Sequence, residues 1–235
     1  MTEARRNAAV STGPCRTLVL GIAGMAVLLG GCVTARLEQE KSAATGIMDG
    51  EAVVVMARSY HLGNETERGF TDCVGDELGN GRTGLAVMPD EQFVDALFPW
   101  LEPRTAPAET KALQRFMQRP GVRDRIRDSG VRYIVWLDGD TERTGGGGSL
   151  SCAAGPGGGG CFGFAWWENE ANYEASIWDL KELKSAGSVK ADVSGTSYLP
   201  AIVIPVPLIA RTKTAACKNL AGRLRSFIAD TGTTG

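Results

Sequence analysis

The chain has 235 residues, of which 43% are hydrophobic and 22% are charged, and its formal net charge at pH 7 is −2. This length and hydrophobic fraction suit one globular domain with a real core. The mildly acidic balance argues against nucleic acid as a partner, because phosphate binding requires a basic face.

The amino terminus has the pattern of a bacterial lipoprotein signal peptide. Three arginines within the first 16 residues precede an apolar run at residues 18–28, which leads into Leu29-Gly30-Gly31-Cys32. The run is shorter than the roughly 20 residues that a membrane-spanning helix needs. Small residues directly before a cysteine predict cleavage between Gly31 and Cys32 and lipidation of Cys32. The alternatives are an uncleaved anchor or a buried helix.

Cleavage at this point would define the organisation of the mature chain. It removes residues 1–31 and leaves 204 residues, and the loss of three arginines and one glutamate changes the net charge from −2 to −4. Residues 32–50 are polar and small, which predicts a flexible tether leading to a single periplasmic domain at residues 51–235. Diacylglycerol and an N-acyl chain on Cys32, each contributing about 0.8 kcal/mol per buried CH₂, would hold the domain on the membrane. Val33 after the cysteine favours the outer membrane under a sorting rule that some bacteria use.

The remaining patterns predict an α/β (α+β) domain with a single mixed β-sheet of about five strands and helices packed on it. The continuous apolar runs at residues 51–58 and 131–137 predict strands that are buried on both faces. Glycines at residues 141–160 predict a long loop. Further strands are expected at residues 161–167, 173–180 and 188–196, a short one at 85–88, and helices at 64–78, 90–98, 108–119, 122–128 and 213–229.

The cysteines indicate disulfides. Cys15 lies in the signal peptide and Cys32 takes the lipid, which leaves an even number of four in an exported chain. Three pairings are open, and the sequence alone does not choose among them. We favour Cys152–Cys161, which would close the glycine-rich loop, and Cys73–Cys217, because both lie on apolar helical stripes; the alternative for the latter pair is two buried free thiols. Metal binding is disfavoured, because close CxxC pairs and nearby histidines are absent.

Residues 199–210 form a strongly apolar segment that contains three prolines. Proline cannot serve a central strand, so the segment is expected at an edge or in an extended stretch. Three interpretations are open: an edge strand beneath a helix, a partner-binding edge available for strand addition, and a contact with the outer-membrane surface. The candidate partner-binding residues are Leu199, Ile202, Ile204 and Leu208.

The other features that could carry chemistry are weak. The glycine runs at residues 145–148 and 157–160 lack the lysine and hydroxyl of a phosphate loop. The one histidine, His61, has no serine and carboxylate set that can be placed around it. Trp166 and Trp178 belong to an aromatic group that predicts either a platform for sugars or peptides or ordinary packing against helices.

Several short segments resemble a known group of proteins. Val53-Val54-Val55, the strand at residues 131–135 and Ile177-Trp178-Asp179 resemble those of periplasmic α/β lipoproteins related to the curli secretion component and the amino-terminal domain of TolB. Residues 204–207 followed by Ala216-Cys217 also resemble uncharacterised lipoproteins of this kind. The resemblance covers residues 51–230 and implies a mixed sheet and a role in envelope assembly or transport. It implies no catalytic residues, and the sequence shows no membrane-crossing hairpins of the pore-forming type.

These observations favour a non-enzymatic, lipid-anchored periplasmic protein that binds other envelope proteins, with no cofactor besides the lipid on Cys32. The first alternative is a hydrolase-like enzyme with an unrecognised site, although no GxSxG motif is present. The second is a glycan or small-ligand binder that uses the region of Trp166 and Trp178.

Overall fold

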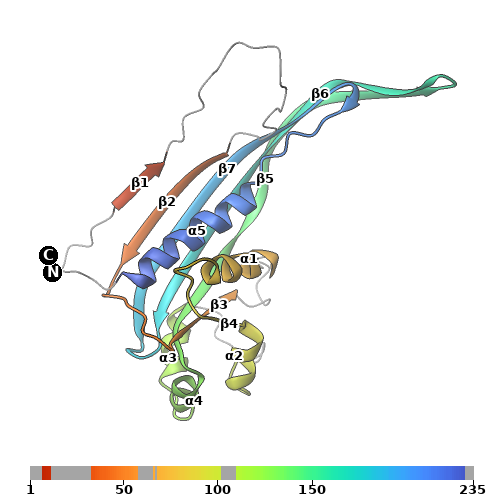
Figure 1. The fold of residues 1–235 in the computed structure, drawn as a ribbon. Helices are drawn as coiled ribbons and strands as arrows, with labels where there is room; N and C mark the ends of the chain where they lie inside the picture. The colour runs from red at the N-terminus through yellow and green to blue at the C-terminus, as the bar shows by residue number, and fades with distance from the viewer. Residues whose placement is uncertain (1–6, 12–32, 58–65, 67, 102–109, 231–235) are drawn as a thin grey trace.

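The computed structural model describes residues 7–11, 33–57, 66, 68–101 and 110–230. They form one mixed β-sheet with helices packed on it, as the sequence predicts (Figure 1). The elements in chain order are β1 (Asn7–Ser11), β2 (Val33–Lys41), β3 (Ala52–Ala57), α1 (Arg68–Gly79), β4 (Val87–Met88), α2 (Asp90–Ala96), α3 (Thr110–Met117), α4 (Val122–Ser129), β5 (Val131–Gly155), β6 (Gly158–Asp179), β7 (Lys184–Pro205) and α5 (Thr212–Ala229).

The sheet has seven strands in the order β1-β2-β7-β6-β5-β3-β4, two more than the sequence analysis expected. β3 pairs in parallel with β4 and β5, and every other pairing is antiparallel. The parallel strands lie at one end of the sheet and the long antiparallel strands at the other. The topology therefore separates a helix-covered end from a meander of hairpins.

Helices cover both faces of the parallel end, which explains the uninterrupted apolar run in β3. Val53 and Val55 pack with α1 and α5 on one face, whereas Val54 and Met56 pack with α2, α3 and α4 on the other. Successive strand residues point to opposite faces, so a strand buried on both sides needs apolar residues at every position. On the α5 face, the ring of Phe70 in α1 stacks on that of Tyr173 in β6, with 3.5 Å between the centroids.

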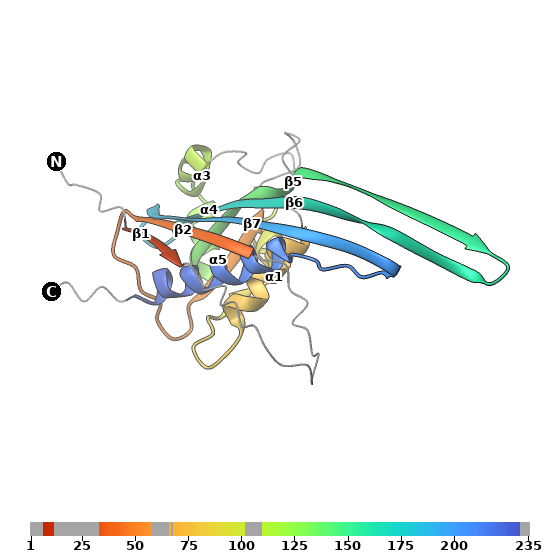
Figure 2. The ribbon, with the colours of Figure 1, turned by 90° about the horizontal axis from the view of Figure 1, so that it is seen from above.

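β5, β6 and β7 extend past the helices as a long ribbon (Figures 1 and 2). The predicted loop at residues 141–160 is therefore wrong, and the strands predicted at 161–167 and 173–180 are parts of the single strand β6. The glycines serve close approach between strands. A Cβ at Gly148 would lie 2.1 Å from the carbonyl oxygen of Phe164, and one at Gly163 would lie 2.2 Å from that of Ser149. Both glycines have positive φ, which other residues adopt only at a cost.

The flexible tether predicted for residues 32–50 is also wrong over the residues that the structure describes. Residues 33–41 form β2, which pairs with β7, and the alternate residues Ala35 and Leu37 pack against the core. Further along, the hydroxyl of Thr45 donates a hydrogen bond to the carbonyl of Phe227. The period of two in β2 was hidden by its polar outer face. The expected cleavage point, Gly31 and Cys32, lies outside the described residues.

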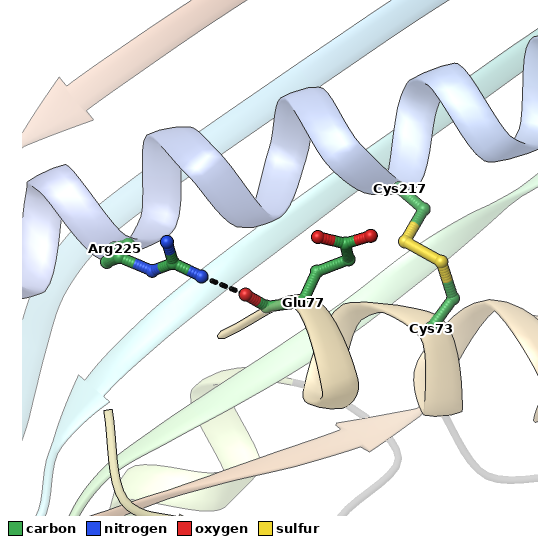
Figure 3. Close-up of a disulfide and its surroundings, with 4 residues drawn as sticks. All are labelled: Cys73, Glu77, Cys217 and Arg225. Atoms are coloured by element: carbon green, nitrogen blue, oxygen red, sulfur yellow. Dashed lines mark hydrogen bonds between the residues drawn. A yellow bond between two sulfur atoms is a disulfide. The ribbon is translucent and has the colours of Figure 1, made fainter. Parts of the chain in front are cut away.

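A disulfide clamps the first helix to the last (Figure 3). Cys73 in α1 and Cys217 in α5 are bonded, with 6.3 Å between their Cα atoms, and this is the pairing that the sequence favours. One helical turn along each helix, Arg225 of α5 donates a hydrogen bond to the backbone carbonyl of Glu77 in α1. The two helices that cover the long strands are therefore held together by a covalent bond and by a polar contact.

Candidate functional site

The most distinctive part of the molecule is the outer part of the ribbon. Residues 144–167 and 195–210, here called the arm, contain no Asp, Glu, Lys or Arg, although 22% of all residues in the chain are charged. The first stretch includes the ends of β5 and β6, and the second includes the end of β7 and the chain that returns from it. Figures 1 and 2 show the arm projecting from one end of the helix-covered body.

The charged residues stop at one level across the three strands. Glu168 on β6 lies opposite Gly145 on β5 and opposite Thr196 on β7. Just below this level, the guanidinium of Arg143 lies over the ring of Trp167, 5.6 Å from its centroid. Beyond Glu168, β6 continues for ten uncharged residues, which span about 33 Å. The boundary is thus a property of the folded ribbon and is shared by all three strands.

One face of the arm is aromatic and aliphatic. Phe162 lies opposite Ile202 and Phe164 opposite Pro200, and directly opposite residues share a face of the ribbon. Phe162 is 74% exposed and Ile202 is 79% exposed, so these side chains project into solvent. Most exposed large hydrophobic side chains of the described chain gather here, with only Val33, Met48 and Phe98 elsewhere; those on the arm are Phe162, Phe164, Ile202, Val203, Ile204, Val206 and Ile209.

The structure divides the four candidate residues of the proline-containing segment. Ile202 and Ile204 are exposed, whereas Leu199 and Leu208 are half-buried. The segment continues β7 to Pro205 and then turns back, so that Leu208 and Tyr198 exchange two backbone hydrogen bonds of 2.7 and 2.9 Å. β2 pairs with β7 only as far as Gly195, so the proline-containing part of β7 lies past the end of that pairing, in accord with the edge position expected for it.

A second disulfide lies near the tip of the arm. Cys152 on β5 and Cys161 on β6 are directly opposite each other and are bonded, with 4.0 Å between their Cα atoms. This is the other pairing that the sequence favours, although it joins two paired strands and does not close a loop of irregular chain. The bond fixes the register of the hairpin close to its turn and thereby keeps the apolar face in one arrangement.

The arm also has an open edge of backbone. β3 covers β5 only as far as Leu137, and within the described residues no strand pairs with the outer side of β5 from there to Gly155. The N–H and C=O groups on that side are available to an added strand. The arm therefore offers both an apolar face and a row of unpaired backbone groups.

The two larger hollows of the molecule offer weaker sites. The first, of about 510 Å³, lies beside Arg132, which bonds the buried Asp179 at 2.7 Å and lies 3.8 Å from Glu51. Burial lowers the pKa of Arg132, but a hydrogen bond with Tyr133 and the carboxylate of Asp179 outweigh it, so the pKa is raised. The polar groups at this hollow are thus largely engaged in ion pairs within the chain.

The second hollow, of about 560 Å³, is lined by Asp72, Asp76 and Asp90 with apolar neighbours. Over the residues that the structure describes, no three metal-ligating side chains come close enough together to hold an ion. His61 lies outside the described residues. The arrangement of these hollows gives no nucleophile and base in contact.

The tryptophan platform is not formed by the two residues that the sequence analysis named. Trp178 is 5% exposed and packs with α2, α3 and α4 at the body end of β6. Trp166 is half-buried on the arm, twelve residues away along the same strand, which corresponds to about 40 Å. The two rings cannot contact one small ligand.

Comparisons with known proteins do not assign a family. No known protein family matches the chain, and no curated protein does. Among solved structures, PelC dodecamers from Paraburkholderia phytofirmans are similar at a TM-score of 0.38 and 12% sequence identity. They include one of a methionine-substituted PelC that covers 85% of this chain and one of PelC that covers 84%, each over 98% of the PelC chain. At this TM-score the likeness assigns neither family nor function. In the described part of the chain, no helix is long and apolar enough to cross a membrane.

Proposed function

We propose that this protein is a non-enzymatic, lipid-anchored envelope protein that binds another envelope protein in assembly or transport, and that the arm is its binding element. The observation that carries the proposal is the arm itself, where exposed hydrophobic side chains stand on 40 residues without a charge. Contiguous exposed apolar surface of this kind is a mark of interaction sites. An aromatic and aliphatic centre without charged groups is also the composition of interface cores.

The open edge of β5 favours a protein partner over lipid. Backbone N–H and C=O groups on that edge need hydrogen-bond partners, and hydrocarbon supplies none, so each group would cost several kcal/mol there. An extended segment of another protein can satisfy the same groups by strand addition while its side chains cover the apolar face. A protein partner thus satisfies both features of the arm at once.

A second candidate function is insertion of the arm into the bilayer, which the position of the expected anchor favours. Val33 pairs with Gly195, the first uncharged residue of β7, so the chain arrives from Cys32 at the base of the arm. The hydrocarbon core of a bilayer is about 30 Å thick, similar to the length of the uncharged part of β6. The same open edge would then have to be paired inside the membrane.

Chemical crosslinking in intact cells tests the proposal. The Ile202→Lys/Ile204→Lys variant places two charges on the exposed face, and Met48→Lys, at a 60% exposed position on the body, is the matched control. Such surface changes alter stability by about 0.5 kcal/mol or less, so all three proteins stay folded. We expect one defined protein adduct in the wild type and the control and none in the arm variant. An adduct that persists in the arm variant would refute the arm as the binding element.

A further inference from the structure

The outer edge of the sheet is covered by a strand that the expected processing removes. β1 pairs antiparallel with β2 from Asn7 opposite Gln39 to Ser11 opposite Ala35, and it forms the border of the sheet (Figure 1). All of β1 precedes Gly31, so cleavage before Cys32 would release it with the signal peptide. The β2 edge, which β1 shows to be able to accept an antiparallel strand, would then be open.

We propose that the processed chain forms a two-fold dimer in which β2 pairs antiparallel with β2 of a second copy, centred on Leu37. This inference rests on the lipoprotein processing contained in the proposed function. Leu37 is the middle residue of β2, so this register uses the whole strand from Val33 to Lys41. In the precursor, β1 occupies the same edge and prevents the pairing.

Charge complementarity selects both the occupant and the register. Centring on Leu37 places Arg36 opposite Glu38 of the other copy, twice across the two-fold axis. The two side chains are 62% and 43% exposed and lie on the same face, where they already form an ion pair of 2.7 Å within the chain. Centring the pairing on Arg36 or on Glu38 would bring like charges face to face, which destabilises a sheet. Charges on an edge strand commonly prevent pairing, but here their signs complement those of a second copy.

The opposite face of β2 supplies apolar contact in the same register. Ala35 and Leu37 pack against the core beneath α5 but are only half-buried, because the sheet ends there once β1 is gone. In the dimer, each Leu37 meets its counterpart and covers it. A continuous sheet results, and the core of one copy is extended by that of the other.

The dimer also constrains how the arms are used. Because the two β2 strands are antiparallel, and β7 is antiparallel to β2, the two arms leave the shared sheet in opposite directions. Both arms can dock on proteins at the two ends of the dimer, whereas they cannot both enter one bilayer end-on. The dimer is therefore compatible with the first candidate function and not with end-on insertion.

Analytical ultracentrifugation of the detergent-extracted protein tests the pairing, with intact mass to define the amino terminus. We expect the wild type, lacking residues 1–31, to be dimeric and the Cys32→Ala precursor to be monomeric. Arg36→Glu should weaken the dimer by about tenfold or more, since Glu then faces Glu38. The Arg36→Glu/Glu38→Arg variant should restore it. A processed wild type that is monomeric, or a single variant that remains as dimeric as the swap, would overturn the inference.

A cysteine crosslink reads the register directly. Leu37→Cys should form a disulfide-linked dimer in processed protein, because residue 37 faces itself. Thr34→Cys, six residues from its own counterpart along the ladder, should not. Equal crosslinking of both variants would also overturn the inference. If intact mass shows that residues 1–31 remain on the wild type, the lipoprotein part of the proposed function fails together with the dimer; if they are absent and the protein is monomeric, the dimer alone fails.

Discussion

The disulfide between Cys73 and Cys217 should be the largest single covalent contribution to stability. It joins residues 144 positions apart, whereas the arm disulfide joins residues 9 positions apart. In the chain-entropy description, a crosslink stabilises by restricting the unfolded chain, and the effect grows with the logarithm of the closed loop. The free energy of unfolding should therefore fall by about 5 kcal/mol in Cys73→Ala/Cys217→Ala and by about 2.5 kcal/mol in Cys152→Ala/Cys161→Ala.

The arm pair is the matched control, because the same atoms are removed in both variants. Cys217 is fully buried, so the lost packing adds to the effect of the helix disulfide. Denaturant unfolding followed by circular dichroism and by tryptophan fluorescence gives both free energies. We expect the helix variant to be less stable than the arm variant by at least 2 kcal/mol. Equal losses, or a larger loss in the arm variant, would refute the reasoning from loop length.

Two further predictions concern the buried polar groups. Asp179→Asn leaves the guanidinium of Arg132 without its buried partner at 2.7 Å, so urea unfolding should show a loss of about 3 kcal/mol, while Glu182→Gln, an exposed control, should lose less than about 1 kcal/mol; equal losses would contradict this. Burial raises the pKa of Tyr173, against a lowering effect of its hydrogen bond with Thr141. The unfolded chain therefore ionises first, and stability should fall as pH rises through about 10, a slope that Tyr173→Phe should reduce if the reasoning holds.

The strands of the body could be predicted from the sequence because their burial leaves a direct trace. The apolar residues of β3 occupy consecutive positions, since α1 and α5 cover one face and α2, α3 and α4 the other. The stripe in α5 likewise reports one buried face, including Cys217. In both cases the packing partner is apolar, so hydrophobic periodicity carries the information.

The arm could not be predicted by the same argument. Its strands are held by backbone pairing and a disulfide, and its glycines, such as Gly148, are required because the neighbouring backbone leaves no space for a Cβ. In a sequence, this requirement is indistinguishable from loop flexibility. The signal that identifies the arm is the absence of charge over residues 144–167 and 195–210, which becomes one surface only when β5, β6 and β7 are aligned.

β2 was missed for a related reason. Its inward residues Ala35 and Leu37 alternate with charged ones, and the strand stands beside β7, which is distant in sequence. Period-two patterns with small apolar residues are weak evidence unless the neighbouring strand is known. The position of β2 beside the lipidation motif also favoured a tether, because such segments commonly follow an anchor.

Site-specific photo-crosslinking along β6 tests the proposed role of the arm most directly. A photoreactive side chain at Phe162 or Phe164 projects from the apolar face, one at Ala165 projects from the opposite face, and one at Met48 on the body is the control. The account predicts a defined protein adduct from Phe162 and Phe164 in cells and none from Ala165 or Met48. Lipid adducts in place of protein, or equal labelling from all four positions, would contradict it.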